Sequence, residues 1–161
     1  MANNSQIVTI CTEELDRFIK EVQANMTKED ANASGQSARS LGPEITVTGN
    51  TIRARVSSNP GVFYSETGRG PYSGGPSGGL SEKILRWMPY RGVGTNLTTD
   101  KQRQSLAKFI AMRINMLGTR LFQIGQGRKV RNIYSDERAE AVERIRERIG
   151  ETILRDLSQI R

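Results

Sequence analysis

The chain has 161 residues, of which 35% are hydrophobic and 25% charged, and its net charge is +7. The length is typical of one domain, but the hydrophobic fraction is low for a compact globule, so we expect a protomer that buries apolar surface against neighbours. With no histidine and a single cysteine, the sequence excludes histidine-based catalysis, Cys/His zinc sites and an internal disulfide. An enzyme would have to use carboxylates, lysine or tyrosine instead.

The positive charge is concentrated in the middle of the chain. Residues 35–134 carry 15 basic and 4 acidic side chains, whereas residues 1–34 and 135–161 have net charges of −3 and −1. Such a segment favours nucleic acid or an acidic protein surface, although ordinary solvated lysine and arginine explain it equally well. No apolar run reaches the roughly 18 residues of a membrane span, and the first residues lack the pattern of a secretory signal.

The first predicted elements are an N-terminal arm, residues 1–11, and a helix from about 12 to 31. Thr12 supplies a capping hydroxyl, and the two glutamates after it place negative charge at the positive end of the helix dipole. Apolar residues then recur at helical spacing. They are Leu15, Phe18, Ile19, Val22 and Met26. A short helical turn is expected within residues 36–41, before Gly42-Pro43.

The segment ITVTGNTIRARV, residues 45–56, is typical of a β-hairpin. Apolar and polar residues alternate on both sides of Gly49-Asn50, which accept the backbone conformations of a tight turn. Arg53 and Arg55 fall on the face opposite the apolar side chains, so we expect them to be exposed or to meet a partner. Residues 62–64 are predicted to form a short strand.

The glycine-rich segment ETGRGPYSGGPSGG, residues 66–79, is predicted to be a shaped loop. Gly68 and Gly70 fit the first two positions of a dinucleotide-binding motif, but Ser73 occupies the third, and no Gly-Lys pair exists for a Walker-type loop. We therefore expect no phosphate site. Tyr64 and Glu66 are expected to anchor the start of the loop, with the carboxylate held by a backbone amide or an arginine.

A short helix is predicted over residues 80–88, ended by Pro89, with Trp87 packed in the core. No spacing brings two carboxylates together in the middle of the chain, so no hydrolytic pair is predicted. The acids in this segment are Glu44, Glu66, Glu82 and Asp100.

The longest apolar stripe predicts a helix from about 100 to 117 as the most buried helix of the chain. Thr99 and Gln102 match a capping box at its start, and Gly118 ends it. Residues 123–131 are expected to form a basic loop or arm that meets DNA phosphates or an acidic partner. Its cations are Arg128, Lys129 and Arg131.

The last predicted element is an amphipathic helix over residues 135–161, capped by Ser135. Its apolar stripe is narrow and flanked by alternating glutamate and arginine, a pattern suited to docking on one other surface. The stripe consists of Val142, Ile145, Ile149, Ile153, Leu157 and Ile160. Together these elements predict a single α+β domain over residues 1–161, with an N-terminal helix, a small antiparallel sheet with long excursion loops, a long central helix and the C-terminal amphipathic helix.

The order of the motifs resembles the minor-tail or tail-completion family of tailed bacteriophages, also described as head–tail connector or neck proteins. ASGQSARSL (residues 33–41) follows the first helix, VFYSETGRGP (62–71) follows the hairpin, and AKFIAMRINMLGT (107–119) ends the long helix. The resemblance covers about residues 12–160. The sequence departs from the family pattern at GQGRKVRNIY (125–134) and in the long glycine-rich loop.

The resemblance implies a virion structural protein without catalytic activity, cofactor or metal. It implies a homo-oligomeric ring, six-fold or twelve-fold, that joins the portal side to the tail and lets DNA pass, assembled in the bacterial cytoplasm and located at the head–tail junction. Portal or adaptor proteins, tail proteins and packaged DNA would be its neighbours, without sequence-specific binding and without a membrane. The alternative is a small basic nucleic-acid-binding module. The expected interaction residues are Tyr64, Glu66, Arg69, Tyr72, Arg53, Arg55, Arg128, Lys129 and Arg131.

Overall fold

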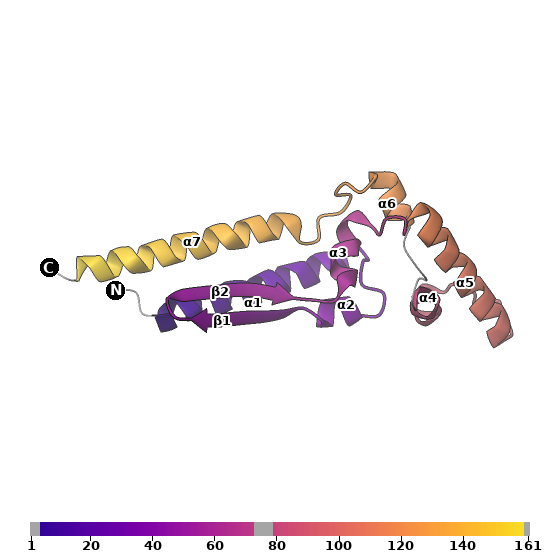
Figure 1. The fold of residues 1–161 in the computed structure, drawn as a ribbon, viewed down its shortest axis with the longest axis horizontal. Coiled ribbons are helices and arrows are strands. Elements are labelled where there is room, and N and C mark those ends of the chain that lie inside the picture. The colour runs from indigo at the N-terminus through magenta and orange to yellow at the C-terminus, as the bar shows by residue number, and fades with distance from the viewer. Residues whose placement is uncertain (1–3, 73–78, 160–161) are drawn as a thin grey trace. The chain divides into compact units, whose positions relative to one another are not determined.

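The computed structural model describes residues 4–72 and 79–159, and the fold is α+β, as expected (Figure 1). The elements are α1 (Asn4–Lys28), α2 (Gln36–Arg39), β1 (Gly42–Thr48), β2 (Thr51–Ser57), α3 (Pro60–Thr67), α4 (Leu80–Trp87), the 3₁₀ helix η1 (Met88–Arg91), α5 (Asp100–Leu117), α6 (Arg120–Gly125) and α7 (Ser135–Ser158). The described residues form two compact units. Unit 1 comprises residues 4–29, 37–59 and 132–159, and unit 2 comprises 30–36, 60–72 and 79–131.

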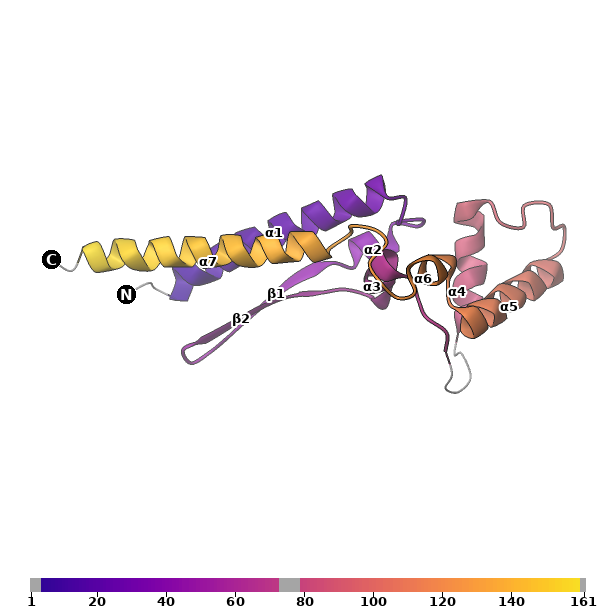
Figure 2. The same ribbon diagram turned by 90° about the horizontal axis from the view of Figure 1, so that it is seen from above.

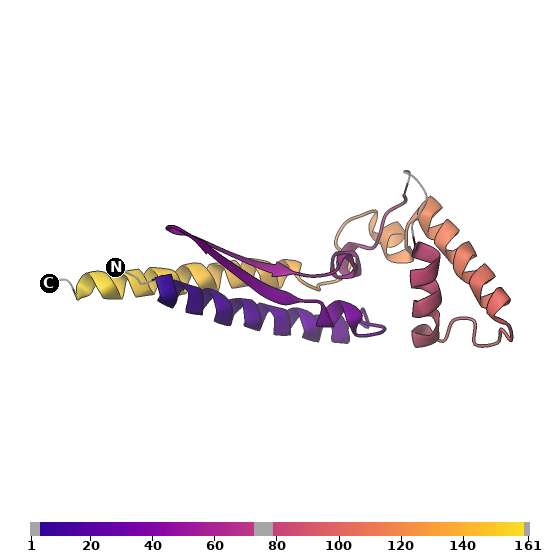
Figure 3. The same ribbon diagram turned by 60° about the horizontal axis from the view of Figure 1, so that its bottom comes forward.

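Helix α1 carries the core of unit 1. It packs against both strands of the hairpin and against α7, which runs alongside it in the opposite direction (Figures 2 and 3). One face of the helix is buried against these neighbours, as the apolar stripe predicts. The buried side chains are Ile10, Cys11, Glu14, Leu15, Phe18, Ile19, Val22 and Met26.

The predicted start of α1 was wrong, because the helix begins at Asn4 and includes residues 4–11 of the supposed arm. Ile10 and Cys11 continue the buried stripe toward the N-terminus. The Thr12 hydroxyl does not cap the helix: it donates a hydrogen bond of 2.8 Å to the Val8 carbonyl one turn back. Burial of the extra turns outweighs a local capping signal that has no tertiary context.

The predicted hairpin is confirmed. β1 and β2 pair antiparallel with Ile45 opposite Ala54 and Val47 opposite Ile52. Gly49 in the turn has φ +56°, in the left-handed region that glycine tolerates. Along β2 the burial alternates, so that the arginine face is exposed as expected.

Helix α7 begins at Ser135, and the predicted cap was therefore displaced by one residue. Tyr134 occupies the N-cap position without a side-chain hydrogen bond, while Asp136 and Glu137 lie in the first turn as predicted. The helix buries Ala141 and turns a polar face, including Arg144 and Arg148, toward α1. Ile145 and Ile149 of the apolar stripe are half-buried while Val142, Ile153 and Leu157 are exposed, so unit 1 covers only part of the stripe.

In unit 2, the predicted strand at residues 62–64 was wrong, because these residues lie within α3. Pro60 is its first residue, where a proline costs no hydrogen bond. Val62 and Glu66, four residues apart, share its buried face. A helical spacing of two buried residues prevailed over the β propensity of Val-Phe-Tyr.

The predicted helices after the loop are confirmed, but their burial was predicted wrongly. Thr99 and Gln102 form the capping box of α5, and Gly118 ends it. Helix α4 passes into η1, so Pro89 continues the coil in 3₁₀ form rather than stopping it. Trp87 is exposed, and α5 buries only Ala107 and Ala111 against its main packing partner α4.

Candidate interaction site

Glu66 is the most deeply placed charge of unit 2, with 0% of its surface exposed. Its Oε1 atom lies 3.8 Å from the ammonium nitrogen of Lys129. Its backbone carbonyl accepts hydrogen bonds from the amides of Val130 and Arg131, at 3.2 and 3.3 Å. Glu66 is thus an anchor, as expected, with Lys129 beside its carboxylate, and the segment after α6 is held against the end of α3.

The first half of the glycine-rich loop is fixed on the corner between α5 and α6. The Arg69 amide donates to the Thr119 hydroxyl at 3.0 Å, and the Thr119 amide donates to the Arg69 carbonyl at 2.8 Å. The Tyr72 amide donates to the carbonyl of Asn115 at 2.9 Å, and the Arg69 guanidinium donates to the Asn115 side chain at 3.3 Å. Residues 68–72 are therefore a shaped loop and not a free linker.

Glycines let this corner close around the ring of Phe122. Gly68 has φ +77°, and a Cβ placed there would lie 2.3 Å from the Phe122 backbone nitrogen. A Cβ at Gly118 would lie 2.7 Å from the ring, and one at Gly70 would lie 3.0 Å from it. No side chain fits at these positions without movement of backbone or ring. We call Glu66, Gly68, Arg69, Thr119 and Phe122 the loop anchor.

The expected interaction residues fall into separate groups. Arg69 and Tyr72 are together, with the guanidinium carbon 5.8 Å from the tyrosine ring centroid. The Tyr64 side chain is exposed, but its carbonyl accepts a hydrogen bond of 3.0 Å from the Gly68 amide, so Tyr64 helps to anchor the loop through its backbone. Residues 73–78, with Gly74, Gly75, Pro76 and Gly78, lie outside the described residues, whereas Gly79 occupies the N-cap position of α4. Sequence reasoning missed Asn115, Thr119 and Phe122, although Gly118-Thr119 was visible as a helix end followed by a capping residue.

The cations of the basic segment after α6 also fall into an exposed group and a group that contacts Glu66. Arg128 is exposed, whereas Lys129 pairs with Glu66 and the amide of Arg131 binds the Glu66 carbonyl. Part of the segment is helical, because α6 extends to Gly125 and the expected loop covers only the residues after it. Its cations therefore serve the loop anchor as well as the surface.

Arg53 and Arg55 belong to unit 1, on the exposed face of the hairpin. The Arg55 guanidinium donates two hydrogen bonds, of 2.7 and 2.9 Å, to the carboxylate of Glu44 on the neighbouring strand. The hydrogen bonds and charge of Arg55 hold the pKa of Glu44 below its ordinary value. This pair occupies one of the two arginines and leaves Arg53 as the more available cation of that face.

Unit 1 also contains a network of ion pairs between α1 and α7. Arg144 Nε and Arg148 Nη1 donate to the two carboxylate oxygens of Glu14, at 2.8 and 2.9 Å. Arg144 also reaches Glu21 at 3.1 Å, and Arg148 reaches Glu13 at 2.5 Å. Burial works to raise the pKa of Glu14, but the hydrogen bonds and charges of the two arginines outweigh it and hold that pKa below the ordinary value.

Three large apolar side chains on one side of α5 are exposed. Phe109 is 56% exposed and Met116 63% exposed, and Met112 between them is exposed as well. With 100° of rotation per residue, the three side chains fall within about 60° of one another, opposite the buried Ala107 and Ala111. We call this set the α5 stripe; exposed aromatic and methionine side chains of this kind are enriched at protein interfaces.

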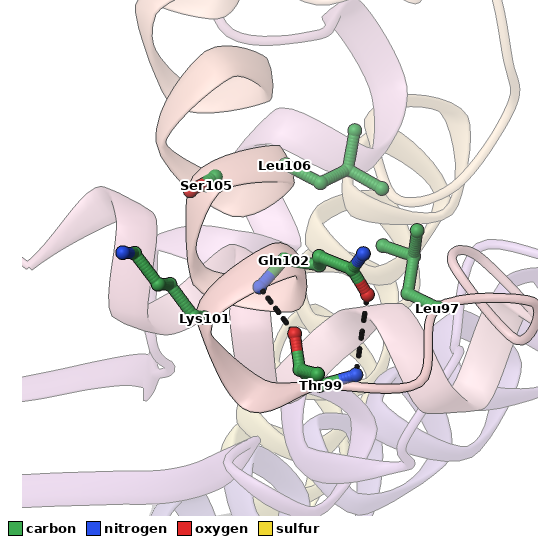
Figure 4. Close-up of a pocket in the computed structure, with 6 residues that line it drawn as sticks. All are labelled: Leu97, Thr99, Lys101, Gln102, Ser105 and Leu106. Carbon is green, nitrogen blue, oxygen red and sulfur yellow. Dashed lines mark hydrogen bonds between the residues drawn. The ribbon is translucent and has the colours of Figure 1, made fainter.

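A shallow cavity of about 580 Å³ lies at the start of α5 (Figure 4). Figure 4 shows Leu97 and Leu106 on one side of the cavity. Thr99 and Gln102 also line it, but their polar groups form the hydrogen bonds of the capping box. Within residues 4–72 and 79–159, no group of three histidine, cysteine or acidic residues is placed to hold a metal ion. None of the helices described here is long and apolar enough to cross a membrane.

Comparisons with known protein families, with curated proteins and with solved structures found no match to this chain.

Proposed function

We propose that this chain is a structural protein of a tailed-bacteriophage virion, without catalytic activity. It forms a six-fold or twelve-fold ring in the head–tail connector or neck, completes the tail, and lets DNA pass between the portal side and the tail. The chain assembles in the bacterial cytoplasm, with portal or adaptor and tail proteins as neighbours. No cofactor enters this proposal.

The observation that carries the proposal is the contact between two of the motifs on which the resemblance rests. The Glu-x-Gly-Arg-Gly motif at residues 66–70 and the Leu-Gly-Thr motif at 117–119 are about fifty residues apart, yet they bind each other through Arg69 and Thr119. Short motifs that meet in one loop anchor are expected of a family pattern that specifies a fold. Surface patterns without such a contact would carry less weight.

The distribution of exposed apolar side chains supports the assembly part of the proposal. Six of the nine aromatic side chains are exposed, and all nine lie in the described residues. They are Phe63, Tyr64, Tyr72, Trp87, Tyr90 and Phe109. Exposed aromatic residues in this number are typical of a protomer whose surface is completed by protein neighbours.

Two measurements test the proposal. Peptide mass spectrometry on purified virions encoding this chain should detect it at a fixed ratio to the portal, and cryo-electron microscopy should resolve it as a ring at the head–tail junction. Its absence from mature virions, or its presence only in the head interior or on the capsid, would overturn the proposal. A variant truncated before α7 should yield unjoined heads and tails.

A basic nucleic-acid-binding module remains the second candidate, because exposed aromatics and positive charge occur in the same unit. Unit 2 carries 12 basic and 4 acidic residues, and aromatic rings beside cations are the usual equipment for stacking bases. Fluorescence anisotropy with single- and double-stranded DNA over a salt series separates the two functions. Tight binding with a steep salt slope that Arg120→Gln/Arg128→Gln reduces would favour the module. A connector ring should bind DNA weakly and without sequence preference.

A further inference from the structure

On helix α7, exposed apolar side chains gather on the side that faces away from α1. Ile153, Leu154 and Leu157 are exposed, Leu154 by 68%, and Val142 extends the stripe toward the start of the helix. At 100° per residue these side chains lie within about 120° of each other and nearly opposite Ala141, Arg144 and Arg148, which face α1. We call this set the α7 stripe.

The charges beside the two stripes have opposite signs. The α5 stripe is flanked by Lys101, Lys108 and Arg113, which are all exposed. Exposed Glu147 flanks the α7 stripe, while exposed Glu143 and Arg146 lie within its arc and pair with each other at 3.4 Å. The α5 flank is therefore cationic and the α7 flank acidic.

We infer that the α7 stripe of one copy of this chain docks on the α5 stripe of the next copy. The inference rests on the proposed ring, for which it names the contact between protomers. Pairing α5 with a second α5 would place lysine and arginine against each other, and pairing α7 with a second α7 would oppose glutamates. The mixed contact matches apolar to apolar and cation to carboxylate, and like charges at an interface are costly.

A contact between two different surfaces of one chain is heterologous, so every copy offers one free α5 stripe and one free α7 stripe. Copies can then add head to tail until the assembly closes. A two-fold contact, by contrast, would use the same surface on both copies and would stop at a dimer. This difference provides a test that does not depend on virions.

The test uses two single variants of the full-length chain. Met116→Glu places a glutamate in the α5 stripe, and Leu154→Glu places one in the α7 stripe. Each variant alone should lose assembly, with apparent affinity between copies weakened about 30-fold or more, as for a central interface residue. Ile124→Glu, which changes another exposed apolar residue outside both stripes, should assemble as the unmodified chain does. Circular dichroism and thermal unfolding confirm that all three variants fold.

The decisive measurement is a mixture of the two stripe variants. A Met116→Glu chain keeps its α7 stripe and a Leu154→Glu chain keeps its α5 stripe, so the mixture should form one-to-one dimers and nothing larger by native mass spectrometry. Failure to form dimers in the mixture, normal assembly of either single variant, or an unmodified chain that stays monomeric would each overturn the inference. Detection in virions is a separate readout, so the proposed function can survive if this contact fails.

Discussion

Helices α1 and α5 differ most in how they use their apolar residues. Of the 25 residues of α1, eight are buried, whereas the 18 residues of α5 are richer in apolar side chains and bury two alanines. The hairpin and α7 both pack on α1, while α4 is the main partner of α5. Burial is therefore decided by how many elements meet a helix, and the apolar surplus on α5 is available to another molecule.

The two units also use charge differently. Unit 1 is close to neutral and ties α7 to α1 through Glu14, Arg144 and Arg148. Unit 2 is strongly basic and buries a single acid at its loop anchor, Glu66. Unit 1 thus combines a core with paired charges, whereas the loop anchor of unit 2 combines glycines and backbone hydrogen bonds around one phenylalanine ring.

The largest expected loss of stability comes from Gly68→Ala in the loop anchor of unit 2. The added Cβ would meet the Phe122 backbone at a position where φ is already positive, and we expect a loss of about 4 kcal/mol or more in the free energy of unfolding. Urea unfolding followed by the fluorescence of Trp87, the only tryptophan, measures it.

Gly92→Ala is the matched control for that experiment. Gly92 also has positive φ, +62°, but nothing lies within 4 Å of its added Cβ. Gly92→Ala should lower the free energy of unfolding by about 1 kcal/mol, because only the positive φ opposes the alanine. Equal losses in the two variants would show that the close packing around Phe122 contributes nothing.

A pair of methionine truncations tests the difference in burial directly. Met26→Ala removes a side chain with no exposed surface and should cost about 3 kcal/mol, because it leaves a cavity in the core of unit 1. Met116→Ala removes an exposed side chain and should change the stability of an unassembled chain by less than about 0.5 kcal/mol. Chemical unfolding of both variants at the lowest practical protein concentration gives the comparison, and similar losses would contradict it.

Glu14→Gln tests the charge network of unit 1 and should cost about 2 kcal/mol near neutral pH, since it leaves two partly buried arginines underpaired. Glu14 has a depressed pKa in the folded state, so its stabilisation is fully present above about pH 4.5 and is lost as the pH falls through the folded pKa. The midpoint temperature of thermal unfolding should therefore fall less steeply between about pH 7 and pH 3 for the variant than for the unmodified chain. Parallel curves would mean that Glu14 does not carry the acid sensitivity.

Apart from the control variants, the smallest expected effect belongs to the Thr119 hydroxyl. Thr119→Val keeps the shape of the side chain but removes the acceptor for the amides of Arg69 and Phe122, and should cost about 1 kcal/mol. Thr119→Ser retains the oxygen and should lose less than half of that. Amide hydrogen exchange at Arg69 should accelerate in the valine variant and stay slow in the serine variant.

Local signals in the sequence determined much of this protein. The α+β class, the hairpin with Gly49 in its turn, the capping box of Thr99 and Gln102 and the helix end at Gly118 were all predicted and confirmed. Each depends on contacts within a few residues, where propensity and capping chemistry are sufficient. Glu66 was also predicted as an anchor, because a lone acid beside a glycine-rich loop needs a partner.

Tertiary structure alone decided which apolar faces are covered. An apolar stripe at helical spacing predicts a face that requires a partner, but not whether the same chain supplies it. The apolar face of α1 is covered, the α5 stripe and the α7 stripe are left exposed, and α7 docks on α1 partly through arginines that local reasoning treats as solvated. The loop anchor likewise joins Gly68 to Phe122 across more than fifty residues, a distance over which no local pattern specifies contact.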